Sequence, residues 1–370
     1  MRARHAVLAL LLGVGTVLLA AEPAGAHGVS GIQPSNFTTI ITGVSPAVRG
    51  LHLQVDDLGN KIELDNNTGT DVTVLGYQGE PYLRVGPAGV YENLRSPAVY
   101  LNRTRTGNVP VPSSANPALA PEWRRVEGGT RARWHDHRAH WLAPSYPPEV
   151  AAHPGSRHLV QRWTLGLVHD GTAITVRGVV EWIPGPSPLP WLATTVLLGA
   201  LVVAFAFTRL ARSAMALALV AMIVGETAYV VGIWGGTTIG GPTKLAAVAY
   251  ALGGMAVGAL ALVWVVRRGV VSAAPLLLLG GLFLALAGGL ANITTLFRSQ
   301  LPTSLPHWWE RFEVAMVLGV GAGVAVVGAL RLRVTPKRVR RPLPERRPAP
   351  AATGATAGAA TGAATGSGDA

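Results

Sequence analysis

Five long apolar segments occupy the C-terminal half of the chain, and they constrain its fold more than any other feature. The segments cover about residues 189–208, 213–234, 245–266, 270–291 and 312–331. Each is long enough to cross a hydrocarbon core of roughly 30 Å as an α-helix. Hydrophobic residues make up 49% of the 370 residues and charged residues only 14%, which favours a membrane protein over a soluble enzyme. We therefore predict five transmembrane helices within residues 188–332.

Positive charges between these segments predict how the bundle is oriented. Arg209 and Arg212 separate the first two segments, Arg267 and Arg268 separate the third and fourth, and a basic run follows the fifth. Positively charged loops stay in the cytoplasm, so the N-terminal domain is expected outside and the C-terminus inside. The net charge of +12 is concentrated beside the membrane, which argues against nucleic-acid binding. Residues 333–370, basic and then rich in Ala, Gly and Thr, are predicted to be a disordered tail.

The N-terminus has the pattern of a secretory signal peptide. A basic start and the apolar run AVLALLLGVGTVLLA are followed by small residues at Ala24 and Ala26. Cleavage of residues 1–26 would make His27 the first residue of the mature chain. An uncleaved anchor, or a cut a few residues away, is the alternative. The chain has no cysteine, so its exported domain must be held together by its core, or by its core and a metal.

Residues 27–187 are predicted to form an extracytoplasmic β-sandwich. Short, partly alternating runs read as strands, and they are separated by segments rich in turn-forming residues. The predicted strands are LHLQV (51–55), KIEL (61–64), DVTVLGY (71–77), LVQRWTLGLV (159–168) and TAITVRGVVEW (172–182). His169-Asp170-Gly171 is a hairpin turn signal between the last two. Residues 96–125 are expected to be irregular loop.

The stretch RWHDHRAHW, residues 133–141, contains three of the ten histidines. On an extended segment His135 and His137 project to the same side, and His140 joins them if the chain turns at Ala139. Imidazole suits zinc, copper, iron and nickel, and Asp136 could act as a ligand or in the second shell. The cluster therefore predicts a metal site, with a structural or pH-responsive cluster and a recognition surface as alternatives.

The mature N-terminus would add further donors to this site. His27 offers its amino nitrogen and its own imidazole, and one or two histidines of the cluster would complete a nitrogen-rich site that favours Cu(II). No methionine lies between Met1 and Met215, so the exported domain lacks the thioether ligands that Cu(I) prefers. Zinc remains an alternative, because three histidines and a water form an ordinary zinc sphere.

An N-terminal histidine on an exported sandwich followed by membrane spans resembles the CopC-type copper carriers and their fusions to CopD-type membrane domains. The resemblance rests on AGA followed by HG at the predicted cleavage site, and on the histidine cluster. The chain departs from that family in its longer domain, its HDH spacing and its fewer spans. The segment from GYQGEPYLRVGPAGVYENLRSPAVYLN (76–102) to WHDHRAHW also resembles a family of actinobacterial exported multi-span membrane proteins, which implies no mechanism.

Two further features are candidate sites. The tyrosine-rich segment 76–102 either borders the histidine site, binds a partner, or packs at a sheet edge. Glu226 falls inside the second apolar segment. A carboxylate is energetically costly inside a membrane, so we treat Glu226 as a candidate functional residue. The alternative is that Glu226 forms a hydrogen bond to a neighbouring helix.

We therefore expect a membrane-anchored extracytoplasmic protein that binds Cu(II) for acquisition, delivery or sequestration, with a copper donor or acceptor protein as partner. A non-metal envelope scaffold and a copper- or zinc-dependent exported enzyme are the alternatives.

Overall fold

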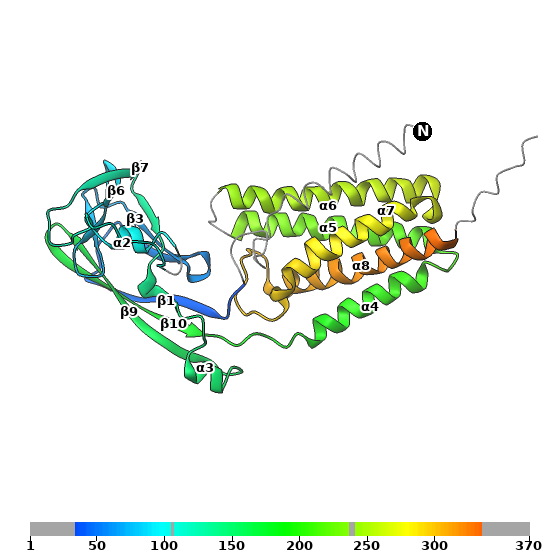
Figure 1. The fold of residues 1–370 in the computed structure, drawn as a ribbon, viewed down its shortest axis with the longest axis horizontal. Coiled ribbons are helices and arrows are strands. Elements are labelled where there is room, and N and C mark those ends of the chain that lie inside the picture. Colours follow the sequence, from blue (N-terminus) through cyan, green and yellow to red (C-terminus); the bar gives the residue numbers. More distant parts are fainter. Residues whose placement is uncertain (1–33, 105–106, 237–240, 335–370) are drawn as a thin grey trace, which may run out of the picture. The chain divides into compact units, whose positions relative to one another are not determined.

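The computed structural model describes residues 34–104, 107–236 and 241–334. An antiparallel β-sheet domain comes first along the chain, and a helical region follows it (Figure 1). The predicted signal peptide, His27 and the tail from residue 335 onward lie outside the described residues.

Two antiparallel sheets build the β domain. The larger has the strand order β1-β10-β9-β4-β5-β6-β7, and the smaller has the order β2-β3-β8. The strands are β1 (Phe37–Ser45), β2 (Leu51–Asp56), β3 (Lys61–Asn66), β4 (Val72–Leu75), β5 (Pro81–Gly86), β6 (Gly89–Asn93), β7 (Trp123–Glu127), β8 (Arg131–Trp134), β9 (His158–His169) and β10 (Thr172–Trp182). Two short helices, α2 (Ala98–Leu101) and α3 (Pro148–Ala152), lie in the connections.

The strands β9 and β10 form the hairpin that was predicted around His169-Asp170-Gly171. His169 pairs with Thr172, and the turn between them is made by Asp170 (φ 48°) and Gly171 (φ 74°). Positive φ at both central residues gives the turn a twist that matches the flanking strands. Alternate residues Ile174 and Val176 are at most 1% exposed, as the period of two requires.

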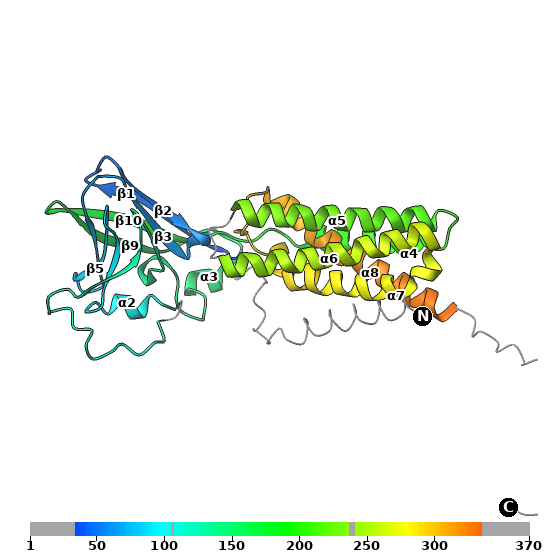
Figure 2. The ribbon, with the colours of Figure 1, turned by 90° about the horizontal axis from the view of Figure 1, so that it is seen from above.

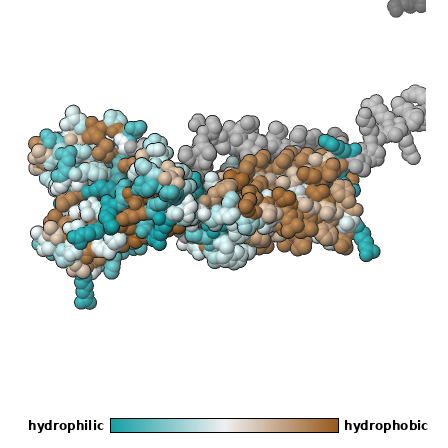
Figure 3. Space-filling view, turned by 90° about the horizontal axis from the view of Figure 1, so that it is seen from below, coloured by the Kyte–Doolittle hydropathy of each residue, from teal (hydrophilic) through white to brown (hydrophobic). Residues whose placement is uncertain are grey.

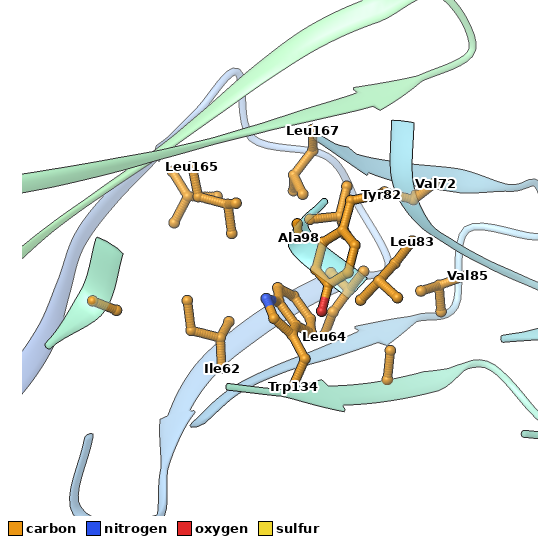
Figure 4. Packing of buried hydrophobic residues seen from close by; sticks show 14 of the residues in the cluster. Ile62, Leu64, Val72, Tyr82, Leu83, Val85, Ala98, Trp134, Leu165 and Leu167 are labelled. Atoms are coloured by element: carbon orange, nitrogen blue, oxygen red, sulfur yellow. The ribbon is translucent and has the colours of Figure 1, made fainter. Parts of the chain in front are cut away.

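Both sheets contribute to one hydrophobic core. Ile62 and Leu64 of β3 lie near Leu165 and Leu167 of β9, with Trp134 of β8 beside them (Figure 4). Burial of each large apolar side chain stabilises the fold by about 1.5–3 kcal/mol, so this core can hold a domain that has no disulfide. The antiparallel β-sheet domain is thus confirmed, and an immunoglobulin-like or CopC-like topology stays a prediction.

The helical region contains the predicted apolar segments. Its elements are α4 (Leu189–Phe205), α5 (Ala211–Gly236), α6 (Gly241–Arg268), α7 (Val270–Phe283), the π-helical η3 (Leu284–Gly289), the 3-10 helix η4 (Leu290–Leu296) and α8 (His307–Val334). Apolar side chains cover much of its surface, whereas hydrophilic side chains are prominent on the β domain (Figure 3).

Among the described residues, four helical segments are long and apolar enough to cross a membrane. The sequence predicted five transmembrane helices. The first predicted span is α4, whose 17 residues extend about 25 Å, short of a hydrocarbon core of about 30 Å. Four of the predicted spans are therefore supported by length, and the first one, α4, stays a prediction. The fourth predicted span also differs from a regular helix, because it continues from α7 through η3 and η4.

Small residues set how closely the helices pack. A Cβ atom added to Gly319 of α8 would lie 2.2 Å from the carbonyl oxygen of Thr195 in α4.

Arg331, near the end of α8, donates a hydrogen bond of 2.5 Å to the carbonyl of Ala206 at the end of α4, so these two helices run parallel. Arg212, at the start of α5, donates to the carbonyl of Val265 near the end of α6, so these two run antiparallel (Figure 2).

Candidate functional site

The three predicted histidines lie together where β8 ends. The imidazole rings of His135 and His140 stack with centroids 4.1 Å apart and planes 27° apart. The ring of His137 meets that of His135 edge-on at 5.1 Å. A turn of 3-10 helix over His137–Ala139 produces this arrangement, and the hydroxyl of Thr39 fixes it by donating to the carbonyl of Ala139 at 2.5 Å. The predicted turn at Ala139 is confirmed.

Backbone carbonyls orient two of the three rings. The Nδ1 atom of His135 lies 2.7 Å from the carbonyl oxygen of Asn60, and the Nε2 atom of His137 lies 2.8 Å from that of Thr104. A carbonyl only accepts, so each of these nitrogens carries the proton in its ring. Hydrogen bonds of this kind fix the tautomer and orientation of metal-binding histidines. The same two hydrogen bonds also hold three separate segments of the chain together.

Asp136 is the centre of a buried ion pair. Its carboxylate is fully buried and accepts hydrogen bonds from the indole of Trp134 at 3.0 Å and from the Nε of Arg138 at 2.8 Å. Burial alone would raise the pKa of Asp136, but the hydrogen bonds and charge of Arg138 outweigh burial and hold that pKa below its ordinary value. The carboxylate is thus committed to Arg138 and Trp134, and none of these bonds orients an imidazole.

Arg138 extends this network to the end of β4 in the larger sheet. Its guanidinium donates to the carbonyls of Leu75 and Gly76 at 3.1 and 3.2 Å, and it lies over the ring of Tyr77. The hydroxyl of Tyr77 accepts a bond of 3.2 Å from the backbone of His137 and donates to Asn102. Burial, and next the charge of Asp136, raise the pKa of Tyr77 to about 12, so this phenol stays neutral. Tyr77 therefore borders the histidine cluster, one of the roles predicted for its segment.

The described residues do not complete a metal centre by themselves. Within the described ranges, no group of three His, Asp or Glu side chains is placed to hold a metal ion. The lone pairs of a ring nitrogen lie in the ring plane, and the nearly parallel planes of His135 and His140 direct them alongside each other rather than toward one point. A centre here needs a donor from elsewhere, and the predicted donor, His27, lies outside the described residues.

A second group of polar residues lies in the helical region. Glu226 of α5 is 5% exposed, and Glu310 and Glu313 of α8 are 6% and 4% exposed. Sequence reasoning identified Glu226 and missed the other two. The signal was present in HWWERFEV, where two acids three residues apart begin the last apolar segment and therefore share a helix face.

No family model, curated protein or solved structure matches the chain. Functional inference therefore depends on the chemistry of these two groups of residues.

Proposed function

We propose that the chain is a multi-pass membrane protein whose β domain lies outside the cytoplasm and binds Cu(II) through His27 and the histidine cluster. The observation that carries this proposal is the contact of three imidazoles, two of them oriented by carbonyls. The bound copper would be acquired, delivered or sequestered, with a copper donor or acceptor protein as the partner.

His27 supplies what the described cluster lacks. The amino nitrogen and imidazole of a mature N-terminal histidine form a two-nitrogen chelate, so one imidazole of the cluster is enough to give three nitrogen donors. Such a set suits Cu(II), which prefers nitrogen ligands in a tetragonal arrangement. His140, which is 8% exposed, and His135, stacked on it, are the residues we assign to the third position.

The proposed orientation rests on the arginines of the helical region. Arg212 bonds to the end of α6, and Arg331 bonds to the end of α4, so basic side chains gather where α4, α6 and α8 end. Positive charge marks the cytoplasmic side. A reporter fused after Gly185 should be exported and one fused after Pro350 should be cytoplasmic. Export of the second reporter would rule out five spans.

The copper proposal is tested on full-length protein whose mature N-terminus has been mapped by mass spectrometry. Cu(II) is titrated against a competing chelator in three variants: one residue added before His27, the double variant His135→Ala with His140→Ala, and the control His153→Ala at an exposed position. The first two should weaken binding at least about tenfold, because each removes a nitrogen donor. The control should bind as the wild type does.

Proton competition gives a second readout. Ligand nitrogens must be deprotonated, so affinity should fall as the pH drops through about 6.5–8, the range of unperturbed histidine and amine groups. Equal Cu(II) affinity with and without the added residue would overturn the role of His27. Tight zinc binding that survives the added residue would instead place a zinc site on the cluster.

A further inference from the structure

Packing of α5 against α8 brings three carboxyl groups together inside the helical region. Glu310 and Glu313 share one face of α8, and the charge of Glu313 interacts with those of both Glu226 and Glu310. All three side chains are more than nine-tenths buried. A carboxylate at membrane depth is costly, and three together add mutual repulsion, so something must neutralise them.

Two small cavities lie beside these carboxyl groups and share two lining residues. Glu226, Glu313 and Tyr229 line the first, and Glu310 and Tyr229 line the second; Asn292 lines both. Each cavity has a volume of about 20 Å³. A water molecule needs about 10–15 Å³ and polar partners, so each cavity has room for one water between acidic side chains.

Two of the carboxyl groups have no protein partner in the part of the chain that the structure describes. No hydrogen bond or ion pair from residues 34–104, 107–236 or 241–334 reaches the carboxyl of Glu226 or Glu313. Glu310, in contrast, lies close enough to the side chain of Thr303 for that hydroxyl to stabilise its carboxylate. A carboxyl group without a protein partner needs water or a bound ion to compensate its burial, so protein contacts alone do not account for Glu226 and Glu313.

Among the side chains that the structure describes, the helices packed around the three acids supply no neutralising charge. Tyr229 of α5 and Tyr250 of α6 line the first cavity, and a phenol cannot supply a positive charge. The segment Val270–Leu296 contains no titratable side chain. Arg311 of α8 donates to the carbonyl of Arg298 at 2.7 Å and forms no ion pair with the three acids among the described residues. With no counter-charge among the described side chains, a bound cation or protons remain as the means of neutralisation.

The backbone leaves a recess for one of these groups. A Cβ atom added to Gly288, in the π-helical η3, would lie 2.8 Å from Oε1 of Glu226. Widened π-helical turns are frequent at functional sites. The recess does not form a cage for a metal ion, because no three acidic or histidine side chains of the described residues are placed to hold one.

We propose that Glu310, Glu313 and Glu226 form a proton-binding relay that water in the two cavities connects. In each step a proton leaves a carboxyl or hydronium oxygen and forms an O–H bond on the next water or carboxylate, with no change in oxidation state. Leu219, Met222 and Val320 are buried on the side of Glu226 and Glu313 toward the basic helix ends, and they close that side with apolar side chains. The relay therefore runs from Glu226 and Glu313 toward Glu310, near the start of α8.

Infrared spectroscopy of the full-length protein in detergent tests the relay, because protonated carboxyl groups have a carbonyl band that shifts in deuterium oxide. At neutral pH exposed carboxyl groups are ionised, so a remaining band reports buried, protonated ones. We expect this band in the wild type, its loss in the triple variant Glu226→Gln, Glu310→Gln, Glu313→Gln, and no change in the exposed control Glu149→Gln.

Single variants test the connection between the groups. Glu226→Gln should shift the band that remains from Glu313, because the two share a cavity, whereas Glu149→Gln should not. Circular dichroism and size-exclusion chromatography establish that each variant is folded. Identical neutral-pH spectra for the wild type and a folded triple variant would overturn the proposal. So would saturable binding of Na⁺ or Ca²⁺ that the triple variant loses, because the occupant would then be a metal ion.

Discussion

The β domain and the helical region bury acidic side chains in opposite ways. Asp136 is fully buried and accepts hydrogen bonds from both Trp134 and Arg138. Glu226 is almost as buried, yet no described side chain bonds to its carboxyl. The first arrangement compensates the loss of water with protein donors and holds three chain segments in place. The second leaves the compensation to something that binds, which is why we assign structure to Asp136 and proton binding to Glu226.

The largest expected effect comes from breaking the buried ion pair. Arg138→Ala leaves Asp136 buried and uncompensated, and removal of one partner from such a pair costs about 3–5 kcal/mol. Hydrogen exchange of the strands β4 and β8 in the full-length protein should report this loss. The control Arg131→Ala, an exposed partner of Asp65, should leave exchange nearly unchanged. Equal protection in the two variants would show that the network around Asp136 is not a structural centre.

Acid should act on the same ion pair. The folded-state pKa of Asp136 lies below its ordinary value, so its contribution to stability is present above the unfolded-state pKa of about 3.9 and is lost as the pH falls through the folded-state value. Asp136→Asn has no such group to protonate. Below about pH 4 the wild type should therefore lose β-domain stability that the variant has already lost at neutral pH. Parallel pH profiles for the two proteins would contradict this assignment.

How much the sequence could predict differs between strands. Alternation and the turn at Asp170-Gly171 located β9 and β10, because one face of each is buried. The pattern fails in β5, where Tyr82 and Leu83 are adjacent and both at most 5% exposed. Helix α2, over residues 98–101, fell in a segment predicted as loop. Here tertiary contacts, which the local pattern does not contain, decide the structure.

The candidate sites show the same limit. Spacing predicted that His135, His137 and His140 meet, because a turn at Ala139 is a local event. The carbonyls that orient two of the rings belong to Asn60 and Thr104, distant in sequence, so no local pattern could reveal them. Glu313 was overlooked because an acid near the start of an apolar segment resembles an interfacial residue; only the packing of α5 on α8 places it beside Glu226.

Filling the recess at Gly288 should have an intermediate effect. Gly288→Ala would place a methyl group 2.8 Å from both Oε1 of Glu226 and Cγ1 of Val317, and overpacking of this kind costs about 1–3 kcal/mol. Gly253→Ala is the matched control in α6, because nothing lies within 4 Å of its added Cβ. Thermal unfolding, followed through the helical circular-dichroism signal, should distinguish the Gly288 variant from the Gly253 variant. The Gly288 variant should also shift the carboxyl infrared band; a shift in the Gly253 variant alone would place the buried acid elsewhere.

The smallest expected effect is the most informative for the comparison. Glu226→Gln keeps the shape of the side chain and removes a carboxyl group that has no partner among the described residues. The amide of the glutamine then replaces the carboxyl as a polar group without a protein partner. We expect the helical region to change in stability by less than about 1 kcal/mol, against the clear loss in Asp136→Asn. Thermal unfolding of the full-length protein in detergent at neutral pH measures both. A loss in Glu226→Gln as large as that in Asp136→Asn would mean that Glu226 is held by a charged partner, and the contrast between paired and unpaired burial would no longer separate the two regions.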